Sequence, residues 1–313
     1  MSGFETAWYE GTRMQLSPNE LATWAGEHLP TPVLRRVIGQ CLGSLSVALC
    51  LHRVAEAERT TDWQPGLNIA PTRLDALIEL LVSSRPTSAP WLTVSFDDGY
   101  DDAAQYIASR APRFKTVEFL FFVCPEKLEQ RAGFRWDAAE EALKAGAAKS
   151  VAAALMAAPV TLATENARPD LRALADAPEY QLASVETVKQ LARLPNVKLG
   201  NHSNLHLVAT QLPVLEVDED YRRSTETFTR LFGPQRHFAF PFGTPKFQFD
   251  QRHVELLRAL GDFTIWSTEP RPYRAGERGV QPRYAVNGRQ SAKAIAGWVA
   301  ARALKYRCQS LRT

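Results

Sequence analysis

Short runs of apolar and β-branched residues recur along the chain, and each ends in polar, glycine or proline residues. Such runs are typical of strands that are buried on both faces. They predict seven strands, at residues 44–51, 92–96, 117–123, 197–199, 238–240, 263–266 and 284–286. Helical patterns separate most of them, at residues 71–82, 102–110, 185–194, 216–232 and 249–260. The alternation predicts an α/β fold with a parallel sheet, open or closed into a barrel.

Three further segments complete the predicted organisation around a barrel domain at residues 44–290. Residues 1–43 predict an N-terminal helical extension, with one helix starting at Pro18 and another at Thr31. Residues 126–180 are rich in alanine and predict a helical insertion. This insertion either covers the site or packs on the flank, and we favour the flank. Residues 291–313 predict a C-terminal helix.

Composition narrows the class of protein. The chain has 313 residues, of which 45% are hydrophobic, which is enough for a sizeable core. The net charge of +3 and the absence of a long basic run argue against nucleic acid as a partner. No cysteines form a CxxC pair, which predicts reduced thiols: Cys41, Cys50, Cys124 and Cys308. Because no signal segment or transmembrane run is visible, we expect a soluble cytoplasmic protein.

Chemically active side chains follow four of the predicted strands. They lie in the segments HR at 52–53, DDG at 97–99, HSNLH at 202–206 and PFG at 241–243. Because the carboxyl ends of parallel strands share one edge of a sheet, we expect these segments to converge. Asp97 and Asp98 are the first candidates for function, since two adjacent carboxylates are costly to bury without a cation or water. Asp101 and Asp102 are instead expected to begin the next helix at a solvated turn.

His202 and His206 are four residues apart, which is a spacing seen in metal sites. If Ser203 or Asn204 starts a helix, both imidazoles lie on one side of its first turn. Two histidines and one carboxylate are a usual ligand set for a divalent metal. The motif is not the HExxH of zinc proteases, because Ser203 follows the first histidine. The acidic segment also lacks the spacing of a calcium loop.

These segments resemble the motifs of a known family, the polysaccharide deacetylases (the NodB-homology domain, carbohydrate esterase family four). SFDDG at 95–99 is similar to their TFDDG motif, and HSNLH at 202–206 to their H-[ST]-x-x-H metal motif. FAFPFG at 238–243 resembles the third motif in the FAYPFG form of one branch, and LHRV at 51–54 and PRY at 282–284 resemble that branch more weakly. The resemblance implies a distorted (β/α) barrel of seven or eight parallel strands and metal-dependent N-deacetylation.

The resemblance also implies roles for individual residues. It implies three ligands of a divalent metal, most often zinc in this family: Asp98, His202 and His206. Asp97 is then the general base, which takes a proton from water activated by the metal. The backbone N–H of Phe242 is the implied donor to the oxyanion. Pro241 and Gly243 are the implied substrate-binding residues beside it.

The chain departs from the family pattern in two places. Ala239 stands where the R-x-P-[YF] motif has the arginine that orients the base, and we hypothesise that Arg283 takes this role. The family's late general-acid histidine has no counterpart, because no histidine follows His253. His52 is the best remaining candidate for an acid or a substrate contact. Trp266 either lines the acyl or sugar pocket or belongs to the core.

The sequence therefore predicts a metal-dependent carbohydrate N-deacetylase. Its substrate would be an N-acetylated or N-formylated amino sugar in a saccharide or lipid-linked precursor. One alternative is a catalytically degenerate member that binds saccharide without turnover, which Ala239 and the missing late histidine suggest. Another is a glycoside hydrolase with two acidic residues. That alternative is weaker, since the adjacent Asp97 and Asp98 do not easily flank a bond from opposite sides.

Overall fold

A parallel sheet of seven strands forms the centre of the computed structural model, which describes residues 6–9, 12–15, 17–56, 66–157, 174 and 177–310. The strands are β3 (Val47–Leu51), β6 (Leu92–Phe96), β7 (Val117–Val123), β8 (Val197–Asn201), β9 (His237–Ala239), β10 (Thr264–Trp266) and β11 (Tyr284–Ala285). Their spatial order is β10-β9-β8-β7-β6-β3-β11, and every neighbouring pair is parallel. All seven predicted strands are present, with ends that differ by at most three residues.

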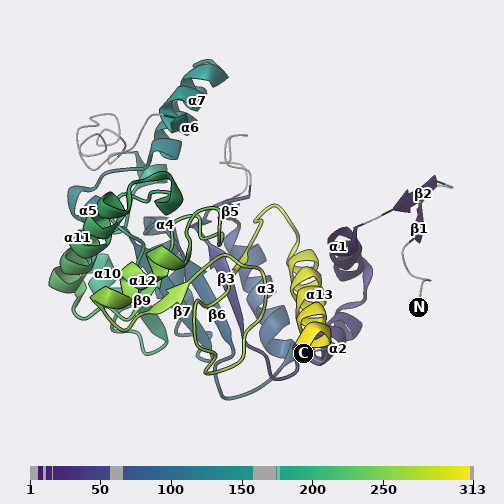
Figure 1. Cartoon of the computed structure of the whole chain (residues 1–313). Coiled ribbons are helices and arrows are strands. Elements are labelled where there is room, and N and C mark those ends of the chain that lie inside the picture. The colour runs from purple at the N-terminus through teal and green to yellow at the C-terminus, as the bar shows by residue number, and fades with distance from the viewer. Residues whose placement is uncertain are drawn as a thin grey trace.

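The sheet curls into a distorted barrel, as the fold class predicted (Figure 1). The segment before β11 joins its two edges, because Gln281 forms a parallel bridge with Trp266 of β10 while Tyr284 pairs with β3. Strands β3 and β6 are buried along their whole length, which explains why they consist almost entirely of apolar residues. A small apolar cluster fills the interior: Ala48, Leu120, Phe122, Ala239 and Trp266.

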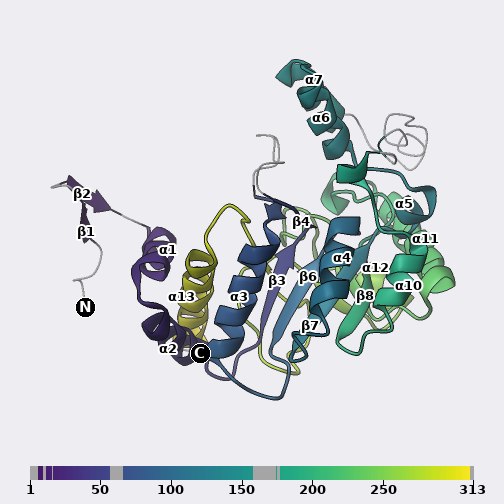
Figure 2. The ribbon, with the colours of Figure 1, turned by 180° about the vertical axis from the view of Figure 1, so that it is seen from behind.

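Helices cover the outside of the sheet, and Figure 2 shows them from behind. They include the five that the sequence predicted: α3 (Pro71–Ser84), α4 (Asp101–Arg110), α10 (Val185–Leu191), α11 (Val214–Phe232) and α12 (Gln251–Leu260). The terminal helices are α1 (Pro18–His28), α2 (Thr31–Leu42) and α13 (Ala292–Ser310). Helix α13 packs against α1, α2 and α3, so the C-terminal helix and the first two helices of the chain lie together on one side of the barrel (Figure 1). None of the described helices has the length and apolar character needed to cross a membrane.

The predicted insertion is helical. It contains α5 (Pro125–Gln130), α6 (Arg135–Lys144), α7 (Lys149–Ala157) and the 3₁₀ turn η3 (Pro178–Tyr180), while residues 158–173 lie outside the described part of the chain. The sequence analysis did not predict four short strands, which form the antiparallel pair β1 (Thr6–Tyr9) and β2 (Thr12–Gln15) and the parallel pair β4 (Arg53–Val54) and β5 (Asn68–Ile69). Elements of two to four residues are too short to show a periodicity.

Candidate active site

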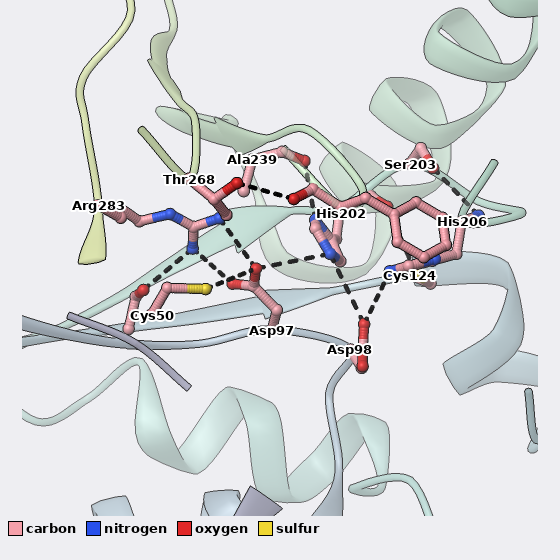
Figure 3. A network of polar contacts seen from close by, with 12 residues as sticks. Cys50, Asp97, Asp98, Cys124, His202, Ser203, His206, Ala239, Thr268 and Arg283 are labelled. Carbon is pink, nitrogen blue, oxygen red and sulfur yellow. Dashed lines mark hydrogen bonds and ion pairs between the residues drawn. The ribbon is translucent and has the colours of Figure 1, made fainter. Parts of the chain in front are cut away.

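The expected convergence of polar residues at the carboxyl edge of the sheet is confirmed (Figure 3). Asp97 and Asp98 directly follow β6, and His202 directly follows β8. Arg283 reaches the same place from the start of β11 and contacts Asp97. Strand pairing explains the meeting, because β6 and β8 both neighbour β7 and all these strands run in one direction.

Asp98, His202 and His206 form a compact buried group. The Nε2 atom of His206 lies 3.0 Å from Oδ1 of Asp98, and Nε2 of His202 lies 3.6 Å from the same oxygen. One ligand atom from each residue lies within 4.8 Å of the others. Two ligands at zinc distances in a tetrahedral site are about 3.4 Å apart, which is close to both separations. The spacing therefore fits one divalent metal ion.

The hydrogen bonding of His202 provides a test of this fit. Its Nδ1 lies 2.8 Å from the carbonyl oxygen of Ala239, which can only accept, so Nδ1 carries the proton. Burial lowers the pKa of His202 to about 4, so the ring is neutral at pH 7 and its Nε2 is unprotonated. Among the described residues this Nε2 has no hydrogen-bond partner, and it faces the carboxylates of Asp97 at 3.7 Å and Asp98 at 3.6 Å. The lone pair of this nitrogen and those of the two carboxylates repel one another in a buried place. A cation between them is needed to offset the repulsion.

The two histidines meet through a loop. The expectation that Ser203 or Asn204 starts a helix is wrong, because residues 202–208 are irregular. The chain turns at Ser203 (φ 59°) and at His206 (φ 54°), and the Ser203 hydroxyl accepts the His206 N–H at 3.2 Å. The ring centroids of His202 and His206 are 4.8 Å apart as a result.

Left-handed backbone conformations are concentrated at this site. Of the six non-glycine residues with positive φ in the described chain, four belong to it: Asp98, Ser203, His206 and Phe242. Each such residue costs about 1–3 kcal/mol, and such costs persist mainly at functional sites. The clustering of these left-handed residues is independent support for a function at this edge of the sheet.

Arg283 holds Asp97 through two parallel hydrogen bonds, from Nη1 to Oδ1 at 2.6 Å and from Nη2 to Oδ2 at 2.9 Å. The arginine is 0% exposed, and it also donates to the Ser95 hydroxyl and to the Ser267 carbonyl. The Cys50 thiol donates to Asp97 Oδ2 at 3.4 Å. Burial alone would raise the pKa of Asp97, but the charge and hydrogen bonds of Arg283, together with His202 and His52, hold that pKa well below its usual range. Asp97 is therefore an oriented, ionised carboxylate.

The segment of Pro241, Phe242 and Gly243 forms a tight turn beside the histidines. Thr268 fixes this turn, because its hydroxyl donates to the Phe242 carbonyl at 2.9 Å and its N–H to the Gly243 carbonyl at 2.7 Å. A Cβ atom at Gly243 would lie 2.9 Å from the Thr268 side chain, so only glycine fits there. The Phe242 N–H has no acceptor within the described residues, and its ring is 42% exposed and lies 4.9 Å from the His206 ring.

His52 and Trp266 have different surroundings. His52 is partly buried and lies with Cys50 and Asp97 in a group whose ligand atoms are within 4.8 Å of one another. Trp266 is buried in the interior cluster, and its Nε1 donates to Nδ1 of His237 at 3.4 Å. Because His237 begins β9, this bond points the indole away from the carboxyl edge. The structure thus favours the core interpretation of Trp266.

The insertion contributes to the site, so the favoured position on the flank is wrong for its first part. The rings of Phe134 and Trp136 stack at 4.4 Å, and both contact His206 edge-on, at 5.6 and 4.7 Å. Trp136 Nε1 donates to the Tyr100 hydroxyl at 2.8 Å, and that hydroxyl donates to Asp137 at 2.9 Å. The only signal in the sequence was the segment GFRW, which is aromatic within an alanine-rich region.

Two acidic residues have roles that sequence reasoning missed. Helix α4 begins at Asp101 as expected, but Asp102 is mostly buried and accepts hydrogen bonds from Arg53 at 3.1 Å and from the Val54 N–H at 3.3 Å. Asp220 of α11 is buried beside the loop of residues 202–208 and accepts the Asn204 N–H at 3.3 Å. Burial raises the pKa of Asp220 to about 7. These contacts join residues far apart in the chain, so no local pattern reveals them.

Comparison with known proteins supports the fold. No protein-family model and no curated protein matches the sequence. Among solved structures, IcaB from Ammonifex degensii is 20% identical with a TM-score of 0.53, over 82% of this chain and 98% of that one. BC0361, a polysaccharide deacetylase from Bacillus cereus, is 13% identical with a TM-score of 0.55, over 82% and 69%. A de-N-acetylase from Aggregatibacter actinomycetemcomitans is 14% identical with a TM-score of 0.53, over 77% and 95%. The chain therefore has the fold of the polysaccharide deacetylases.

Proposed function

We propose that this protein is a metal-dependent hydrolase that removes an N-acetyl or N-formyl group from an amino sugar in a saccharide or glycan precursor. The observation that carries the proposal is the buried group of Asp98, His202 and His206 beside a carboxylate that Arg283 holds ionised. The likeness in fold to a polysaccharide deacetylase and to a de-N-acetylase supports the choice of an N-acylated sugar. The donor set of two imidazoles and one carboxylate suits zinc.

Asp97 is the proposed general base. A divalent ion held by Asp98, His202 and His206 would polarise the amide carbonyl and lower the pKa of a water molecule. The Oδ2 atom of Asp97 lies 3.7 Å from His202 Nε2, beside the proposed ligands, where the carboxylate would accept the proton of the attacking water. Arg283 is the proposed positioning residue, because its fork fixes both oxygens of the base.

The remaining roles concern the oxyanion and the leaving amine. The free N–H of Phe242 is the proposed donor to the carbonyl oxygen as it gains charge, and the turn between Pro241 and Gly243 keeps that donor in place. Breakage of the C–N bond requires a proton on the departing nitrogen. We assign its delivery to His52, the histidine that lies beside Asp97 outside the ligand set. The products are a free carboxylate and an amino sugar.

Metal analysis combined with product analysis tests the proposal. Purified wild type should contain about one zinc per chain, and His206→Ala should contain far less. His28→Ala, at an exposed histidine of α1, is the matched control and should keep its metal. Equal metal content in wild type and His206→Ala would overturn the site. Wild type should release acetate from N-acetylglucosamine oligomers; metal-loaded protein that binds these oligomers without release would favour the saccharide-binding alternative.

A further inference from the structure

A cavity lies outside the residues of the proposed reaction. It has a volume of about 410 Å³ and lies between α1, α13 and the loop that joins β11 to α13. This volume falls within the range of roughly 300–1,000 Å³ that is usual for ligand sites. Its lining is aromatic, acidic and amide-rich: Asn19, Glu20, Thr23, Trp24, Glu27, Ala285, Asn287, Gln290 and Trp298.

Two indole rings in this lining are held by neighbouring side chains. Trp24 is 43% exposed, and its ring stacks on that of His28 with centroids 4.5 Å apart. Trp298 is partly buried, and the Tyr284 ring meets it edge-on at 5.3 Å. Because packing restrains both indoles, they offer apolar faces whose ordering costs little when a ligand binds.

Two carboxylates of α1 line the cavity, and that of Glu20 accepts the Ser17 N–H at 2.8 Å as part of the helix cap. In the part of the chain that the structure describes, neither Glu20 nor Glu27 forms an ion pair. Glu27 accepts only the Ser291 hydroxyl at 3.3 Å, and the ammonium of Lys293 is bound to the Glu27 main-chain carbonyl at 2.8 Å. Exposed carboxylates beside indole faces are a suitable environment for a ligand cation.

The cavity is close to the proposed active site along the sheet. Ala285, which lines the cavity, pairs in register with Cys50 of β3. The thiol of Cys50 donates to the proposed base Asp97, and Arg283 lies two residues before Ala285. Cavity and site are therefore at the same edge of the barrel, on neighbouring strands.

We propose that this cavity binds a deacetylated amino-sugar unit of a saccharide. The sugar would place a C–H face on Trp24 or Trp298, its hydroxyls on the amides of Asn287 and Gln290, and its ammonium near Glu27. An N-acetylated unit carries no charge and binds more weakly. The choice of ligand rests on the proposed function, since an ammonium appears on the sugar only when the acyl group leaves.

Binding of two matched tetrasaccharides tests the inference. Glucosamine and N-acetylglucosamine tetrasaccharides are titrated calorimetrically into the full-length Asp97→Asn protein, so that neither is turned over. The glucosamine form should bind more tightly, and Trp24→Ala or Glu27→Gln should weaken its binding by about threefold to tenfold. Leu304→Ala on α13 and Glu255→Gln on α12, both at exposed positions, are the matched controls and should have no effect. Added salt should weaken binding of the charged form.

The outcomes separate this inference from the proposed function. Affinity that is unchanged by both Trp24→Ala and Glu27→Gln would overturn the cavity as the site, and equal affinity for both tetrasaccharides would overturn the role of charge. Glucosamine binding that depends on both side chains supports the inference even if wild type releases no acetate, in which case only the proposed function falls. Acetate release by wild type without such binding would overturn only the inference.

Discussion

Arg283→Met removes one half of a fully buried ion pair while keeping much of the side-chain volume. Wild-type Arg283 is 0% exposed, and its guanidinium bonds both oxygens of Asp97 at 2.6 and 2.9 Å. Methionine fills part of the same space but offers no donor. Asp97 is 2% exposed and, among the described residues, would keep only the neutral Cys50 thiol as a side-chain donor, so burial would raise its pKa and destabilise its charged form.

The expected cost follows from this burial. Removing one partner of a buried pair costs about 3–5 kcal/mol, because the other charge remains without compensation. The Ser95 hydroxyl and the Ser267 carbonyl also lose a hydrogen bond each. A cost of this size is a large share of the roughly 5–15 kcal/mol that stabilise an ordinary domain. Arg283→Lys keeps the charge but loses the two-pronged geometry, so its effect should be intermediate.

A double-mutant cycle measures the pair directly. The free energy of unfolding is determined in urea at pH 7 for wild type, Arg283→Met, Asp97→Asn and the double variant. All four proteins are treated with EDTA, so that metal binding does not contribute to stability. Both single variants should lose about 3–5 kcal/mol, and the double variant should be more stable than their sum predicts, because it leaves no unpaired charge.

The same variants separate a positioning role from a structural one. Arg283→Met should lower kcat for acetate release with little change in KM, and Arg283→Lys should recover part of the loss. The reasoning is refuted if Arg283→Met stays within about 1 kcal/mol of wild type, since breaking a buried pair costs more than that. The proposed role of Arg283 in positioning the base is refuted if Arg283→Met keeps full activity.

Two further predictions concern residues that support the site. Asp220→Ala leaves the Asn204 N–H without its acceptor, so metal affinity should fall by about tenfold to a hundredfold in a chelator competition, and unchanged affinity would contradict this. Burial raises the pKa of Asp137 to about 7, so the folded protein keeps a proton that the unfolded chain releases, and stability should fall by up to about 4 kcal/mol as the pH rises from about 4 to about 7. Asp137→Asn should reduce this dependence of the free energy of unfolding on pH, as measured by urea unfolding. A dependence as steep as that of wild type would count against the burial argument.

The fold could be predicted because parallel strands buried on both faces leave a clear pattern. The runs 92–96 and 117–123 are dominated by apolar and β-branched residues, with only Thr93, Ser95 and Glu118 as polar members, and each run is fully or almost fully buried. The parallel topology then predicts that the polar residues after these strands lie together, since the carboxyl ends of parallel strands share one edge of the sheet. Asp97 and His202 are about a hundred residues apart in the sequence, yet their side-chain atoms lie 3.7 Å apart.

The details that were missed depend on loops and on distant contacts. The turn at Ser203 and His206 uses left-handed conformations, which are uncommon for any residue other than glycine, so a helix was the simpler expectation. The Cys50 thiol and the Trp136 indole reach the site from a strand and an insertion whose local patterns describe only packing. Such contacts are set by tertiary structure, and a single sequence does not encode them as a local signal.

The curled sheet, whose two edges meet at the bridge between Gln281 and Trp266, connects two features that the sequence presented as separate. Ala239 ends β9 and belongs to the interior cluster, whereas Arg283 precedes β11 at the other edge of the sheet. The bridge between Gln281 and Trp266 brings these edges together, so an arginine entering from β11 reaches the interior that a side chain at position 239 also faces. Asp97 has both oxygens bonded to Arg283, and a second guanidinium from position 239 would add a buried charge without a partner. We therefore propose that Arg283 takes the role that the family resemblance gives to an arginine at position 239, and the activity of Arg283→Met tests this.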